Sequence, residues 1–129
     1  MAHAIDAYEG KCRELHGHSY RLWVCVEGKK QQNDGMVLDF HILSTIVKEN
    51  ITENYDHSLM LQKTKENRDV IEVLKKRFQR LHTVEFIPTT ENILQHFALL
   101  IKEKLPPTVR LYSLKLQETD SSFAEWFEQ

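Results

Sequence analysis

Three histidines near the start of the chain have spacings that could hold one metal ion. His16 and His18 are separated by one residue and lead into the apolar run Tyr20–Val26, which is typical of a β-strand. Because alternate residues of a strand point to the same face, both imidazoles can reach one ion. His3 could supply a third nitrogen and leave one coordination position open, as in catalytic zinc sites.

The alternative interpretation is a pair of surface histidines at a strand edge, since a His-x-His pair is a short motif that also occurs by chance. Gly17 lies between the two histidines. A glycine there removes a side chain from the opposite face, where a close backbone neighbour could lie. This favours the metal site over the chance pair.

Cys12 precedes the pair by a few residues and could act beside the metal as a nucleophile or base. A nearby cation favours the reactive thiolate form of a cysteine, and the polar neighbours of Cys12 disfavour a packed thiol. Asp56 and His57 place a carboxylate beside an imidazole in a predicted loop. A functional role for this pair requires His57 to meet Cys12 in space; otherwise the two residues form a solvated turn.

Other polar positions have an ordinary structural interpretation beside the functional one. Glu118 ends a predicted strand, where an exposed acid is common. Thr89 and Thr90 are most economically interpreted as caps of a helix. Cys25 lies in the middle of a predicted strand, and we expect it to be buried and inert.

Length and composition indicate one domain spanning residues 1–129. The formal net charge of -2 gives no electrostatic reason to expect a nucleic-acid partner. No apolar run is long enough to predict a membrane span, and no secretory leader is recognised. Two cysteines do not make a disulfide framework, so we expect a reducing, cytoplasmic location.

Hydrophobic spacing predicts an α+β fold. Helices are predicted over 40–54 with Asp39 as the N-cap, over 67–81, and from Thr90 to about 104. Strands are predicted over 19–27, 109–117 and 123–127, with a strand-like run at 36–38 and a β-prone stretch at 83–87. Strands at both ends of the chain with helices between them indicate an antiparallel sheet with helices on one face.

Taken together, the motifs resemble the 6-pyruvoyl-tetrahydropterin synthase / 6-carboxy-tetrahydropterin synthase family, and the resemblance covers nearly the whole chain. The matching segments are Ala2-His3, Cys12-x-x-x-His16-Gly17-His18-Ser19-Tyr20, Gly35-Met36-Val37-Leu38-Asp39-Phe40, Asp56-His57, Pro88-Thr89-Thr90-Glu91-Asn92 and Glu118-Thr119. Each segment is modest alone, and their shared order carries the resemblance.

The resemblance implies a tunnelling fold, in which a four-stranded antiparallel sheet is backed by two helices. Three such sheets close into a barrel as a trimer, and two trimers stack as a hexamer. It also implies a division of roles at the site. Zinc would bind His3, His16 and His18; Cys12 would accept a proton with Asp56 and His57 as its relay; and Glu118, with Thr89 and Thr90, would bind the pterin substrate.

The chain departs from the family pattern in two places. Only Met1 precedes the Ala2-His3 pair, so the first strand is expected to be truncated. Residues 62–86 are longer than the usual link and are predicted to carry an additional, inserted helix.

The spacing between Cys12 and His16 bears on the product. Only three residues, 13–15, separate them, which resembles the 6-carboxy-tetrahydropterin synthases of the queuosine (7-deazaguanine) pathway. We therefore expect a zinc-dependent carbon–carbon lyase that converts 7,8-dihydroneopterin triphosphate to 6-carboxy-5,6,7,8-tetrahydropterin, acetaldehyde and triphosphate. The alternatives are a 6-pyruvoyl-tetrahydropterin synthase, which eliminates triphosphate, and a non-catalytic subunit whose assembly zinc stabilises.

Overall fold

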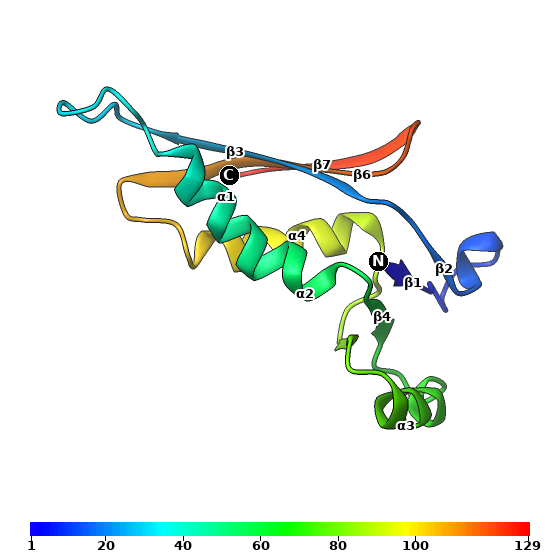
Figure 1. The fold of residues 1–129 in the computed structure, drawn as a ribbon. Helices are drawn as coiled ribbons and strands as arrows, with labels where there is room; N and C mark the ends of the chain where they lie inside the picture. The colour runs from blue at the N-terminus through cyan, green and yellow to red at the C-terminus, as the bar shows by residue number, and fades with distance from the viewer.

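Two separate β-sheets organise the chain, and the computed structural model describes residues 1–129 (Figure 1). The larger sheet is antiparallel and has the order β3-β6-β7. Its strands are β3 (Arg21–Gly28), β6 (Val109–Thr119) and β7 (Ser122–Phe127). The smaller sheet is mixed and has the order β2-β1-β4-β5. Its strands are β1 (Ala2–His3), β2 (His16–Gly17), β4 (Leu59–Gln62) and β5 (Leu81–Val84).

The predicted α+β class is confirmed, but the sheet differs in detail from the single four-stranded antiparallel sheet that we expected. The two-residue strand β1 does not extend the larger sheet. It pairs antiparallel with β2 and parallel with β4, and the Ala2 amide donates to the Ser58 carbonyl at 2.8 Å. His3 is thereby held between two neighbouring strands despite its position near the first residue.

One long helical segment and one shorter helix pack on the same face of the larger sheet (Figure 1). The long segment runs through α1 (Phe40–Val47), a π-helical stretch (Lys48–Thr52) and α2 (Glu53–Tyr55). Asp39 caps it as predicted, accepting a hydrogen bond from the His41 amide at 2.7 Å. The second is α4 (Thr90–Lys102), capped by the Thr89 hydroxyl, which accepts from the Asn92 amide at 3.3 Å.

The main core lies between the larger sheet and α4. Helical spacing places the buried face of α4 against the inward side chains of β6. The buried residues are Ile51, Met60, Ile93, Leu94, Phe97, Ala98, Ile101, Leu111, Leu114 and Leu116. This layer supports the strand ends that carry the site.

The predicted insertion packs beside β4 as a helix and a strand (Figure 1). It contains α3 (Arg68–Arg77) and β5, and a second small core joins Ile71 of α3 to Ala4 and Leu61. The additional helix is therefore present, but it ends at Arg77 rather than near 81, because the chain turns extended at Phe78.

Three smaller predictions were wrong. Residues 36–38 form no strand, and the β-prone stretch is found at 81–84 rather than 83–87. Cys25 is exposed rather than buried, because β3 turns Leu22 and Val24 toward the core and the alternate positions outward.

None of the helices combines the length and the apolar character that a membrane crossing requires.

Candidate metal centre

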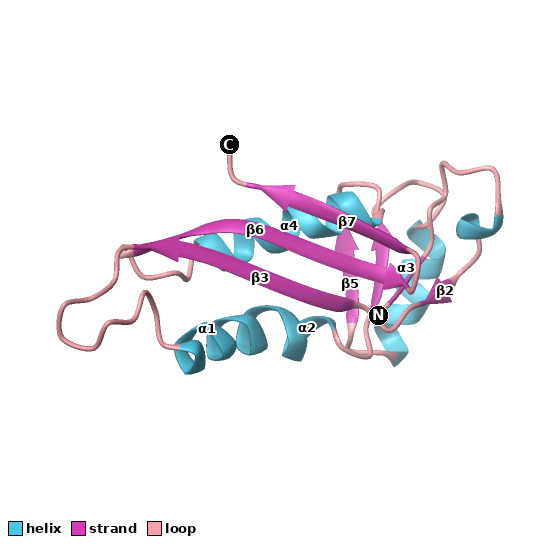
Figure 2. Cartoon of the chain, turned by 90° about the horizontal axis from the view of Figure 1, so that it is seen from above, coloured by secondary structure: helices cyan, strands magenta, loops and turns pink.

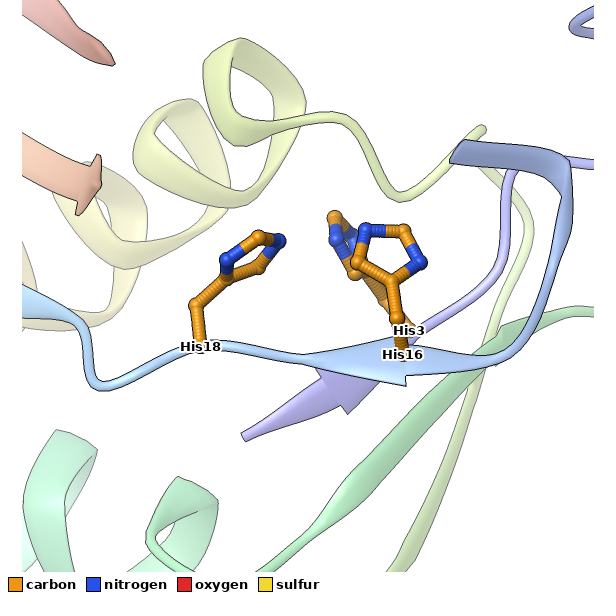
Figure 3. Close-up of side chains that lie close together, drawn as sticks. All are labelled: His3, His16 and His18. Carbon is orange, nitrogen blue, oxygen red and sulfur yellow. The ribbon is translucent and has the colours of Figure 1, made fainter. Parts of the chain in front are cut away.

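The three histidines meet at the junction of β1, β2 and the segment that leads into β3 (Figure 3). His3 and His16 are register partners across β1 and β2, and their ring centroids lie 4.7 Å apart. His18 follows β2, with its ring 4.8 Å from His16 and 5.4 Å from His3. One ring nitrogen from each residue lies within 4.8 Å of the others, a separation that allows all three to bind one ion.

Gly17 lies where β1 approaches β2 closely. A Cβ atom at this position would lie 3.3 Å from the Met1 carbonyl oxygen and 3.5 Å from the Ala2 Cβ atom. The first separation is tight and the second is an ordinary van der Waals contact, and both neighbours belong to the chain at β1. The glycine thus lets the two histidine strands approach each other, as its place between the histidines suggested.

Backbone carbonyls fix the tautomers of two of the histidines. His3 Nδ1 lies 2.7 Å from the Pro88 oxygen, and His16 Nδ1 lies 2.7 Å from the Glu14 oxygen. Because a carbonyl only accepts, both Nδ1 atoms donate, and each neutral ring keeps its Nε2 lone pair free for another bond. Metal-binding histidines are commonly oriented in this way.

His18 provides the strongest test of whether the residues fit a metal. Its Nε2 atom is buried and has no well-aligned hydrogen-bond partner, although Glu118 Oε1 lies 3.2 Å away. Burial lowers the pKa of His18, and the neighbouring His16 and His3 act in the same direction, while Glu118 opposes them. The neutral imidazole is the form that binds metals, so the donor set fits a divalent cation such as zinc.

Glu118 and Tyr20 form the edge of the histidine cluster. Glu118 lies at the end of β6, with Oε1 3.4 Å from His3 Nε2, and it accepts a hydrogen bond from the Tyr20 hydroxyl at 3.2 Å. Burial raises the pKa of Tyr20, and the Glu118 carboxylate adds to this, so the hydroxyl stays a neutral donor. Sequence reasoning selected Glu118 but gave Tyr20 no role, although Tyr20 ends the motif that begins at Cys12.

The start of α4 supports the cluster from the other side. Thr89 caps α4 with its hydroxyl, as the sequence indicated. Thr90 is buried at the first position of α4, and its side chain opposes the rise of the Tyr20 pKa that burial and Glu118 cause. Pro88 accepts the hydrogen bond from His3. These residues therefore position the cluster.

Asp56 and His57 lie in the turn between α2 and β4. His57 Nδ1 is 3.1 Å from Asp56 Oδ1, and the hydrogen bond from His57 holds the pKa of Asp56 below its usual range. The pair shares a cavity of about 520 Å³ with His18 and Tyr20. Both side chains are exposed in a single chain, 88% for His57 and 61% for Asp56. One side of the Asp56–His57 pair therefore faces solvent.

Cys12 lies in a 3₁₀ turn, Lys11–Arg13, and is exposed. Its carbonyl accepts from the Ile5 amide at 3.0 Å, which ties the turn to the residues after β1. The thiol is free, and His57 Nδ1 lies beside Asp56 rather than beside Cys12. The predicted meeting of Cys12 with His57 is therefore not seen within one chain.

Comparison with known proteins shows the family to which the chain belongs. The chain matches the family of 6-pyruvoyl tetrahydropterin synthase over residues 1–129. It is 35% identical over 132 residues to the 6-carboxy-5,6,7,8-tetrahydropterin synthase of Haemophilus influenzae, covering 99% of this chain and 92% of the relative. It is 38% identical over 126 residues to the protein of the same name from Rickettsia conorii, covering 95% and 90%.

A crystal structure of an uncharacterized protein, WS1659 from Wolinella succinogenes, has the same fold. Its TM-score is 0.80 at 21% identity, with 99% of this chain and 92% of that chain covered. The chain belongs to the 6-pyruvoyl tetrahydropterin synthase family, and it is an enzyme of the pterin synthase class.

Proposed function

We propose that this protein is a zinc-dependent lyase acting on 7,8-dihydroneopterin triphosphate. With one water, the reaction would yield 6-carboxy-5,6,7,8-tetrahydropterin, acetaldehyde and triphosphate. The observation that carries the proposal is the cluster of three histidines beside Glu118, opening into the cavity that Asp56 and His57 line. The names of the two relatives indicate the substrate class.

His3, His16 and His18 would hold the zinc through their Nε2 atoms. When bound there, zinc supplies Lewis acidity toward the oxygens of the substrate side chain. The Pro88 and Glu14 carbonyls keep two of the rings in the required tautomer, which lowers the cost of assembling the site. Three protein ligands leave room for a substrate group, the arrangement of catalytic rather than structural zinc.

Glu118 would bind the pterin ring. A carboxylate accepts two parallel hydrogen bonds from a flat edge that carries adjacent N–H groups, such as the guanidine-like edge of a pterin. Tyr20 donates to Oε1 and so orients the carboxylate, while Thr90 lies near Tyr20 at the start of α4. Thr90 thus contributes to substrate binding indirectly, and Thr89 does so by fixing the start of α4.

Cys12 would transfer the proton, with Asp56 and His57 as its relay. A positioned base near the reacting carbons of the substrate is what general acid–base catalysis requires. Cys12, Asp56 and His57 are all exposed in one chain. This is consistent with a site that a neighbouring copy completes in a trimer or hexamer.

Two other functions are alternatives to this proposal, and the experiment described below distinguishes them. A 6-pyruvoyl-tetrahydropterin synthase would use the same residues to eliminate triphosphate without breaking the carbon chain, and the short Cys12–His16 spacing favours the carboxy product over it. A zinc-stabilised subunit without turnover would bind the metal alone. The free thiol and the cavity beside the histidines favour catalysis.

The test is to incubate the zinc-loaded protein with 7,8-dihydroneopterin triphosphate, identify the pterin by mass spectrometry and trap acetaldehyde. We expect a carboxy-pterin and acetaldehyde, both lost with a chelator and in Cys12→Ala. Cys25→Ala is the matched control, because Cys25 is also an exposed thiol but lies on β3. A pyruvoyl side chain without acetaldehyde would identify the alternative synthase, and no turnover by fully loaded protein would leave the non-catalytic subunit.

A further inference from the structure

The end of α2, which leads into Asp56 and His57, is held by side chains from elsewhere in the chain. The last carbonyls of a helix have no partner within the helix. Here four consecutive carbonyls, 53–56, each receive a side-chain hydrogen bond. Arg80 donates to the Glu53 oxygen at 2.7 Å and to the Asp56 oxygen at 3.0 Å, His82 Nε2 donates to the Asn54 oxygen at 2.8 Å, and the Ser58 hydroxyl donates to the Tyr55 oxygen at 2.6 Å.

Arg80 and His82 both come from the segment 62–86, which the sequence marked as an insertion. They flank Leu81, the first residue of β5, and the start of β5 lies beside the end of α2 (Figure 2). The parallel pairing of β5 with β4 sets their place: Leu59 is the register partner of Leu81, and the Leu59 amide donates to the Arg80 carbonyl at 2.9 Å. The donors and the turn they hold therefore belong to one hydrogen-bonded unit.

Two further features strengthen the contacts that Arg80 and His82 make at this end of α2. The cationic guanidinium lies at the C-terminal end of a helix, where a positive charge is favourable. The His82 ring also packs on the Tyr55 ring, with centroids 4.4 Å apart. Arg80 thus binds the Glu53 and Asp56 carbonyls. His82 binds the Asn54 carbonyl and also packs on the Tyr55 ring.

The backbone at His57 explains why such support matters. His57 has a φ of 54°, in the left-handed region that residues other than glycine rarely adopt. A conformation of this kind persists where surrounding contacts determine it. His57 itself is 88% exposed, so its own side chain supplies little of that support.

We propose that Arg80 and His82 are positioning residues that set the geometry of the Asp56–His57 pair for proton transfer. This proposal rests on the proposed function, in which that pair is the relay for Cys12. It assigns the segment 62–86 a role in catalysis, although the segment supplies none of the metal ligands.

The first experiment separates positioning from folding. In Arg80→Ala, kcat should fall on the order of tenfold to a hundredfold, as expected for a misplaced catalytic group. The KM and the zinc content should stay close to those of the wild type. Added guanidinium ion should restore part of kcat, because it can refill the space between the Glu53 and Asp56 carbonyls. Arg77→Ala is the matched control: Arg77 ends α3 and lies over the Phe78 ring, and its loss should leave kcat unchanged.

His82 gives a second, conservative comparison. His82→Gln keeps a donor near the position of Nε2 and should retain most of kcat, whereas His82→Ala should lose it. If Arg80→Ala and His82→Ala lower only the unfolding temperature while kcat is unchanged, the proposal is wrong.

A double variant tests whether Arg80 acts through His57. If it does, adding Arg80→Ala to His57→Ala should cause no further loss of kcat, because the two residues act as one unit. An equal loss in both backgrounds would contradict the proposal.

One measurement does not depend on turnover. In histidine NMR spectra, the His57 signal, assigned by its absence in His57→Ala, should move in Arg80→Ala but not in Arg77→Ala. An unmoved signal overturns the positioning role even if the wild type turns over a pterin. A moved signal with no pterin turnover by the wild type would support the positioning of His57 and contradict the proposed function instead.

Discussion

At the scale of single residues, the candidate metal site depends on one ring nitrogen from each of three histidines. His16 uses Nδ1 to donate to the Glu14 carbonyl and leaves Nε2 free. We predict that His16→Ala will lose bound zinc, as measured by metal analysis after dialysis, because two histidines alone bind zinc weakly. His41→Ala, on the exposed start of α1, should retain one zinc per chain. Full zinc occupancy in His16→Ala would exclude this ligand set.

Glu118 gives a second prediction at this scale. Replacing it by glutamine removes the charge but keeps the shape, so pterin binding should weaken by about 1.5–3 kcal/mol, the value of hydrogen bonds to a charged group. This corresponds to an affinity loss of roughly tenfold to 150-fold. A fluorescence titration with a pterin, alongside metal analysis, measures both properties. Unchanged pterin affinity together with lost zinc would show that Glu118 serves the metal instead.

The histidine cluster could be predicted from the sequence because its information is local. His16 lies in β2 and His18 directly follows it, and Gly17 between them marks the close approach of β1. The contact of Tyr20 with Glu118 could not be predicted in the same way. It follows from the pairing of β3 with β6, in which Arg21 lies opposite Gln117, and such register is not encoded by spacing within one segment.

At the scale of elements, amphipathic helices were easier to predict than short strands. Helix α4 has a threonine cap and a regular apolar face, and its position was predicted well. Strand β4 covers four residues and is stabilised by parallel neighbours from distant parts of the chain, so it carries little pattern of its own. The division into two sheets was missed for this reason, as was the contact of Arg80 and His82 with α2.

The packing of α2 against α4 leads to a prediction about pH. The Tyr55 hydroxyl lies 2.7 Å from His96 Nε2, and burial raises the pKa of Tyr55, so the hydroxyl is the donor and the imidazole is neutral. Burial, with a smaller effect from His82, lowers the pKa of His96 below its usual 6.5. Below pH 6.5 the unfolded chain therefore binds more protons at His96 than the folded chain. The stabilisation of the folded chain by neutral His96 is therefore present above pH 6.5 and is lost as the pH falls.

Urea denaturation gives the free energy of unfolding at pH 7.5, 6.5 and 5.5, which covers about one pH unit either side of the ordinary histidine pKa. His96→Gln keeps an acceptor for Tyr55 but cannot be protonated, so its stability should fall less than that of the wild type toward pH 5.5. His41→Gln, a histidine on the exposed side of α1, should keep the slope of the wild type. The same slope in His96→Gln and the wild type would show that His96 does not contribute to the pH dependence.

At the scale of the whole molecule, the larger sheet has two unpaired edges, β3 and β7. Exposed apolar side chains lie on the same sheet, including Trp23 at 48%, Phe123 at 54% and Phe127 at 53% exposure. Free strand edges pair readily with other chains unless they are closed. We predict a closed oligomer whose mass by light scattering is three or six times the 15.3 kDa of one chain, most simply a hexamer. A stable monomer at micromolar concentration would contradict it.

The last prediction joins this assembly to the chemistry. Cys12 and the Asp56–His57 pair are exposed and make no contact with each other in one chain, so we predict that each active site takes Cys12 from one copy and His57 from its neighbour. Cys12→Ala and His57→Ala should each lose nearly all activity alone and keep only a residual kcat. When equal amounts are refolded together, random assembly should combine two unchanged residues in about a quarter of the sites, and activity should return to that level. Refolding Cys12→Ala with a variant that carries both substitutions is the control and should stay inactive. If the mixture of single variants is also inactive while its oligomers form and bind zinc, the two residues act within one chain, and a movement of the Lys11–Arg13 turn must bring them together.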